Sequence, residues 1–188
     1  MPATASTSPT TAGAPGAPQV PRVGGVAGGV GTTVVAALLQ GIDVGVVNPE
    51  GIEPVQVLVC RSTAHSVQAA VILAARMPRT PVVVVVADCG DRPPASVRHR
   101  LHMAEPNLAA IVRVPWWPSL RDLDDPAARI SEVAWGGVAP SRPERSVPGV
   151  LDALVTAVTP LVTASPPAAQ TRPPPDAATD STAFPHVS

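Results

Sequence analysis

The sequence predicts one α/β domain, built on a small and mostly parallel sheet with helices on both faces, between two proline-rich tails. The first observation behind this prediction is a set of three valine-rich apolar runs, at residues 55–60, 82–87 and 110–115. Such runs are typical of strands that are buried on both faces. The second observation is that segments of helical length and pattern separate the runs, which indicates βαβ units and a three-layer domain. The third is the composition of the two ends.

Both ends of the chain are rich in proline and poor in apolar residues. Of the 25 prolines in 188 residues, five lie in the first 21 residues and six follow residue 162. The other residues there are mostly alanine, threonine and serine, which bury too little surface to offset the entropy lost on ordering. We therefore expect disordered tails at 1–21 and 163–188, and a single domain over 22–162.

The expected elements begin with a glycine-rich turn at 23–33, which leads into a short apolar helix over 33–40. The first apolar run then forms a strand. Ser62 and Thr63 follow it and are suitable N-caps for a helix that ends near Arg76, before a proline. The second apolar run, which is nearly pure valine, predicts the strongest strand.

The second half continues the alternation. Two prolines open the segment 91–105, as suits the start of a helix. The third apolar run is the next strand, and a loop at 115–126 leaves it. A short helix is expected over 127–133. The last helix is expected over 150–162, where apolar residues recur at helical spacing, with Pro160 bending it or ending it a turn early.

Composition excludes several classes of protein. The chain contains no lysine: all 13 basic residues are arginine, against 14 acidic residues, so there is no basic field to attract nucleic acid. The apolar stretches are far shorter than the about 20 residues that cross a bilayer, and no signal peptide is evident. Two cysteines, Cys60 and Cys89, form no disulfide framework. We expect a soluble cytoplasmic protein without membrane insertion or direct nucleic-acid binding.

Residues 26–33, VAGGVGTT, resemble the deviant Walker A box of the ParA/MinD family of P-loop ATPases, whose pattern reads GKGGVGKTT. The GGVG core is intact, and Thr33 matches the magnesium-binding hydroxyl. However, Val26 replaces the leading glycine, Ala27 the signature lysine and Thr32 the phosphate-binding lysine. The resemblance is patchy over about 24–125: no Walker B segment follows the loop, and GIDVGVVNPEGIEP stands where the switch region is expected. It implies a degenerate, truncated relative with a P-loop NTPase-like fold.

This resemblance implies a weak anion site without efficient hydrolysis. Consecutive glycines and a helix N-terminus can hold a phosphate, but a threonine cannot supply the charge that lysine brings to phosphoryl transfer. If ATP or ADP binds with magnesium, it does so weakly, with Thr33 and Asp43 facing the ion. The alternatives are that the glycine run is an ordinary flexible turn between a strand and a helix, and that Asp43 simply caps the turn IDVG. The candidate nucleotide- or phosphate-binding residues are Gly28, Gly29, Val30, Gly31, Thr32 and Thr33.

Further candidates follow the strands. Arg61, Asp88 and Asp91 come just after two apolar runs, and in open parallel sheets ligands bind beyond the carboxyl ends of the strands. Arg61 could replace the missing lysine, or be a plain surface residue; the aspartates could instead cap the next helix. Trp116 and Trp117 leave the third run and should point to opposite sides, one inward and one toward a protein partner, unless both cover the end of the sheet.

Two functional hypotheses remain open. In the first, the chain is a catalytically degenerate ParA/MinD-like domain, an adaptor or regulator with a protein partner and dimerisation allowed. The resemblance then suggests a mobile-element, conjugation or partition setting, because family members position such cargo. In the second, it is a weak nucleotide- or phosphate-binding enzyme that uses GGVGTT, with Arg61 or a partner's arginine in place of lysine. Neither hypothesis predicts an active ATPase.

Overall fold

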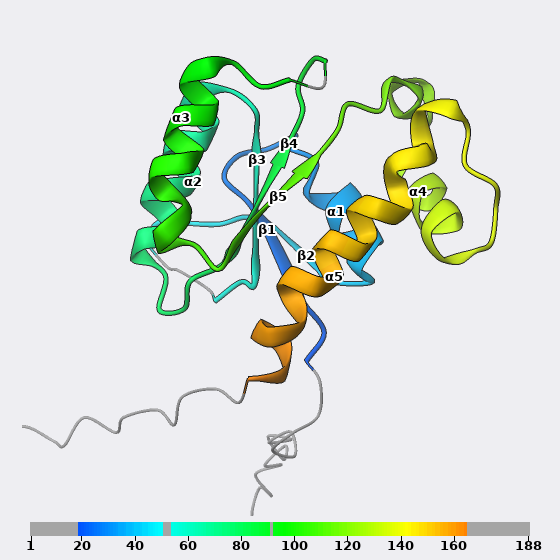
Figure 1. Ribbon diagram of the computed structural model, residues 1–188. Helices are drawn as coiled ribbons and strands as arrows, with labels where there is room; N and C mark the ends of the chain where they lie inside the picture. The colour runs from blue at the N-terminus through cyan, green and yellow to red at the C-terminus, as the bar shows by residue number, and fades with distance from the viewer. Residues whose placement is uncertain (1–18, 51–53, 91, 165–188) are drawn as a thin grey trace, which may run out of the picture.

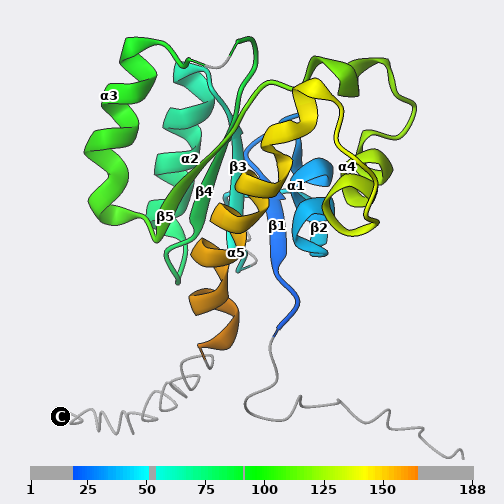
Figure 2. The same ribbon diagram turned by 45° about the vertical axis from the view of Figure 1, so that its right-hand side comes forward.

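The computed structural model describes residues 19–50, 54–90 and 92–164, which form one five-stranded parallel sheet with helices on both faces (Figures 1 and 2). The strands are β1 (Arg22–Gly25), β2 (Ile42–Val46), β3 (Val57–Arg61), β4 (Val82–Val86) and β5 (Ala110–Val114). The α-helices are α1 (Thr32–Leu39), α2 (Ala64–Arg76), α3 (Ala95–Ala104), α4 (Pro126–Trp135) and α5 (Val147–Thr163). Three short 3₁₀ segments complete this part of the chain: η1 (Glu105–Asn107), η2 (Pro118–Asp122) and η3 (Arg142–Ser146).

The strand order is β2-β1-β3-β4-β5, and every neighbouring pair is parallel. The three predicted strands pair as expected, with Val57 opposite Val82 and Val82 opposite Ala110. The predicted α/β class and parallel sheet are therefore confirmed. The predicted tails lie almost wholly outside the described residues, and their disorder stays a prediction.

Two hydrophobic layers explain why the central strands are apolar at successive positions. On one face, Val57 and Val59 pack with α1, α4 and α5; on the other, Leu58 and Cys60 pack with α2 and α3. Figures 1 and 2 show the two groups of helices on opposite sides of the sheet. Because successive side chains point to opposite faces, a strand between two helical layers has no position that favours a polar residue.

The first two strands differ from the expected elements. Residues assigned to the glycine-rich turn form β1, and the segment 41–54, to which no strand was assigned, contains β2. β2 lies at the edge of the sheet with most of its side chains exposed, so it lacks the apolar run of a central strand. The two adjacent glycines of β1 allow close packing: a Cβ on Gly24 would lie 2.4 Å from Val47 Cγ2.

The helices follow the expected pattern with shifted ends. Thr63 caps α2, as predicted: its side chain accepts a hydrogen bond from the Ser66 amide. The last helix begins three residues earlier than expected and continues through Pro160 to Thr163. Leu161 packs against the core after this proline, so tertiary packing maintains the helix there despite the local preference.

Within the described part of the chain, only the segment Arg142–Thr163 is long and apolar enough to cross a bilayer. In the fold it comprises η3 and α5, and its buried residues Val150, Leu154 and Val158 pack against the sheet. This amphipathic placement makes the segment a covering helix of the domain.

Candidate functional site

The glycine loop, residues 26–33, joins β1 to α1 at the carboxyl end of β1. Its start is tied to the sheet, because the Val26 amide donates to the Val59 carbonyl at 3.0 Å. Gly29 and Gly31 have φ of +69° and +95°, a left-handed conformation that strains other residues. Between them, Val30 is buried in the core. The loop therefore has a defined shape that depends on its glycines.

The N-terminus of α1 presents amide groups without helical acceptors. The first helical hydrogen bond runs from the Val35 amide to the Gly31 carbonyl, at 3.1 Å. Amides that precede it, those of Thr32 and Thr33 among them, have no partner within the helix, and the N-cap residue, Gly31, has no side chain that could accept a hydrogen bond from them. These amides give the end of the helix a partial positive charge.

The residue at the lysine position of the resemblance, Thr32, turns back toward the sheet. Its Oγ1 lies so close to β1 that a Cβ on Gly25 would be 2.5 Å from it. A short, uncharged side chain in this place cannot extend over a phosphate held by the loop.

Thr33 and Asp43 lie in direct contact, although they come from different elements. Thr33 Oγ1 donates to Asp43 Oδ2 at 2.7 Å, and the Gly45 amide donates to Asp43 Oδ1 at 2.8 Å. The carboxylate therefore ties β2 to the first turn of α1 and also closes a local turn. Among the described residues, no group of three or more His, Cys, Asp or Glu side chains is placed to hold a metal ion.

Arg61 links the glycine loop to the ends of two strands. Its Nε and Nη2 donate to the Gly29 carbonyl at 3.2 and 2.7 Å, and its Nη1 donates to Asp88 Oδ1 at 3.0 Å. The Asp88 amide in turn donates to Ser62 Oγ at 3.1 Å. The structure thus brings the loop, Arg61 and Asp88 together at one edge of the sheet, whereas Asp91 lies outside the described residues. Each guanidinium nitrogen already has an acceptor, so Arg61 fastens the loop.

A crevice of about 530 Å³ lies over the loop. Its walls include the loop itself, Asp43 of β2, and Asp124 and Asp125 at the start of α4. Asp125 also caps α4, accepting from the Ala128 amide at 2.9 Å. Among the described residues that line the crevice, none is arginine or histidine. Three carboxylates without a facing cation oppose the entry of a highly charged anion.

The tryptophans are placed differently from one another. Trp117 is 4% exposed and donates from Nε1 to Ser146 Oγ at 2.9 Å, so it packs inward. Trp116 is half-buried, and the Arg121 guanidinium lies 5.3 Å from its ring centroid. The sequence did not single out Trp135 as an exposed tryptophan. It ends α4, is 47% exposed and donates from Nε1 to the Leu38 carbonyl at 3.2 Å. Its position at the end of a helix, directly before two glycines, could have indicated this exposure.

Together, the fold and the site define a parallel α/β domain with a structured glycine loop at the carboxyl end of its first strand. Comparison with protein-family models, curated proteins and solved structures finds no match for the chain.

Proposed function

We propose that this chain is a catalytically inactive P-loop-like module that acts in the cytoplasm as an adaptor or regulator of a protein partner. The observation that carries the proposal is the crevice over the glycine loop, whose described lining residues include three carboxylates and neither arginine nor histidine. Phosphoryl transfer depends on positive charge that neutralises the phosphates as the transition state forms. The crevice is lined by negative side chains instead, those of Asp43, Asp124 and Asp125.

The nearest guanidinium supports the same proposal. Three of the five N–H donors of Arg61 are already used, two by the Gly29 carbonyl and one by Asp88, and the Asp88 carboxylate neutralises part of its charge. Those bonds give Arg61 a structural use, and Thr32 offers only a neutral hydroxyl directed toward β1. A glycine loop of defined shape without a cationic side chain over it suits a scaffold better than a catalyst.

The setting is proposed from the resemblance to the ParA/MinD family. Members of that family position cargo such as plasmids, conjugation machinery or division sites, and an inactive relative would act in such an assembly through protein contacts or as a dimer. Of the two neighbouring tryptophans, Trp117 is buried, which leaves the half-buried Trp116 as the candidate contact.

A second candidate function, weak binding of a phosphate-bearing ligand, is favoured by the uncapped amides at the start of α1. These amides could bind one small anion, such as inorganic phosphate. The site suits a magnesium complex of ATP or ADP less well. Thr33 and Asp43 are already bonded to each other, and a nucleotide would add several negative charges beside Asp43, Asp124 and Asp125.

Calorimetric titration with ATP and ADP, with and without magnesium, together with an ATP-turnover assay tests the proposal. We expect no turnover above background and no binding at millimolar nucleotide. The matched variant Thr32→Lys adds one positive charge at the loop. It should increase nucleotide affinity without reaching the ATP turnover of active ParA/MinD-type ATPases. Turnover by the natural chain that Thr33→Ala abolishes would show that the domain is an enzyme.

A further inference from the structure

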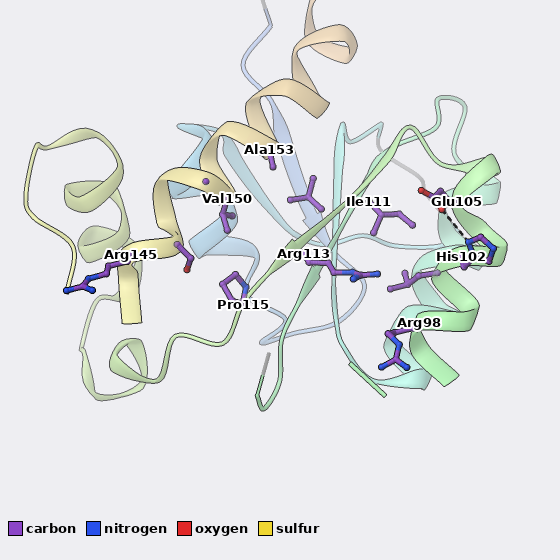
Figure 3. A pocket seen from close by; sticks show the side chains of 13 residues that line it. Arg98, His102, Glu105, Ile111, Arg113, Pro115, Arg145, Val150 and Ala153 are labelled. Atoms are coloured by element: carbon purple, nitrogen blue, oxygen red, sulfur yellow. Dashed lines mark ion pairs between the residues drawn. The ribbon is translucent and has the colours of Figure 1, made fainter. Parts of the chain in front are cut away.

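The edge of the sheet at β5 borders a groove of about 750 Å³ between α3 and α5 (Figure 3). Within the described ranges, β5 pairs with β4 alone. Leu101 and His102 of α3 line one wall, and Val150 and Ala153 of α5 line the other. The groove lies at the opposite edge of the sheet from β2.

The backbone of β5 presents hydrogen-bonding groups to this groove. The Val114 carbonyl accepts from the Ala87 amide, at the end of β4, at 2.9 Å. Because backbone groups alternate in direction along a strand, the amides and carbonyls of Ile111 and Arg113 point away from β4. An edge strand of this kind is a template for pairing with another extended chain.

The two walls of the groove differ in charge. Arg98 of α3 and Arg113 of β5 both line the α3 side, and neither forms an ion pair with another described residue. Glu105, the one acidic residue of the lining, lies 3.7 Å from His102. Figure 3 shows the Arg113 side chain directed toward α3, with Arg98 and His102 on that helix, and Arg145 pointing away on the far side. The α3 wall is therefore basic.

The α5 wall is formed by small, uncharged side chains. Gly149, Val150 and Ala153 follow one another along it, and their small side chains leave space beside the strand. An extended chain added to β5 would point alternate side chains toward the two walls. Acidic residues would face Arg98 and Arg113, and small apolar residues would face α5. A helical segment could not pair with the β5 amides, because its own backbone carbonyls are used within the helix.

We propose that the β5 groove binds an extended segment of a protein partner, in which acidic and small apolar residues alternate, as an added sixth strand of the sheet. Strand addition to an exposed edge is a general mode of peptide recognition, in which backbone bonds provide affinity and side-chain pockets provide specificity. The inference rests on the proposed adaptor role, since it names the kind of partner that the adaptor would hold.

The test uses the full chain and a fluorescent, end-blocked peptide of about seven residues in which aspartate alternates with valine. A peptide with lysine in place of aspartate is the control. We expect the acidic peptide to bind at least about tenfold more tightly, and Arg113→Glu or Arg98→Glu to weaken it by about tenfold or more. Arg76→Glu, at an exposed position at the end of α2 outside the groove, should leave binding unchanged.

Amide hydrogen exchange distinguishes strand addition from simple charge attraction. The bound peptide should slow exchange at the Ile111 and Arg113 amides by about tenfold or more. Equal binding of the lysine peptide, equal binding of a single-stranded oligonucleotide, or binding without this protection would overturn the inference. Absence of peptide binding together with absence of ATP turnover would refute the inference alone, whereas ATP turnover would refute the inactive-module proposal.

Discussion

The ion pair between Glu144 and Arg129 gives this domain a pH-dependent stability that follows from its geometry. The Glu144 side chain is 2% exposed, and its oxygens accept from Arg129 Nε at 3.1 Å and Nη2 at 2.8 Å. The Ser141 amide donates to the same carboxylate at 2.8 Å. The hydrogen bonds from Arg129, reinforced by those from Ser141, lower the pKa of Glu144 from 4.5 to about 2. The pair joins α4 to η3 and so supports the α5 wall of the groove.

The size and sign of the effect follow from linkage. A pKa of 4.5 in the unfolded chain and about 2 in the folded chain corresponds to roughly 3 kcal/mol of stability. Because the folded-state pKa is the lower one, the unfolded chain binds more protons between these values. The contribution of Glu144 is therefore complete above pH 4.5 and is lost as the pH falls toward 2.

The assay is urea unfolding, followed by tryptophan fluorescence, at several pH values between 7 and 2. Glu144→Gln should lower the free energy of unfolding by about 3 kcal/mol at pH 7, and its difference from the natural chain should vanish toward pH 2. Glu132→Gln is the matched control: Glu132 is 59% exposed and 3.8 Å from Arg129, and its loss should cost at most about 0.5 kcal/mol. A difference for Glu144→Gln that stays constant across the pH range would refute the reasoning.

Three further predictions concern the glycine loop and the core. Arg61→Ala should accelerate amide exchange throughout the glycine loop and cost about 1–2 kcal/mol, measured by denaturation; unchanged exchange would show that the guanidinium does not fasten the loop. Gly24→Ala should destabilise the domain by about 1–3 kcal/mol, because its new methyl group would overlap a neighbouring side chain, whereas Gly28→Ala, with open space around it, should cost less than half as much. An alkylating reagent should modify the exposed Cys89 first, since burial raises the pKa of Cys60 to about 12; modification of both thiols at equal rates in the folded chain would contradict this.

The central strands β3 and β4 could be predicted from sequence because burial on both faces leaves a local signal, an unbroken apolar run. β5 is an edge strand, but it keeps an apolar run interrupted only by Arg113, and the segments between the three runs have the length of helices. β2 could not be found in the same way, because an exposed edge strand such as IDVGV carries polar and glycine positions. Its strand character depends on pairing with β1, which is a tertiary interaction.

The site could be predicted only at the level of topology. Parallel strands place their carboxyl ends at one edge, so the approach of Arg61 to the glycine loop was expected. That Arg61 would bond to the Gly29 carbonyl depends on how the loop orients its peptide groups, and no local pattern reports this. Likewise, Arg98 and Arg113 face one groove only because α3 packs beside β5.

The two candidate surfaces use different parts of the sheet. The glycine loop leaves β1 and lies over the carboxyl ends of β3 and β4: Arg61 holds the Gly29 carbonyl, and a Cβ on Gly31 would be 3.4 Å from Val86 Cγ2. The groove instead runs along the free side of β5, where the pairing groups belong to the backbone. Because backbone pairing groups do not depend on the side chains of the loop, substitutions in the glycine loop leave the edge of β5 available to a partner.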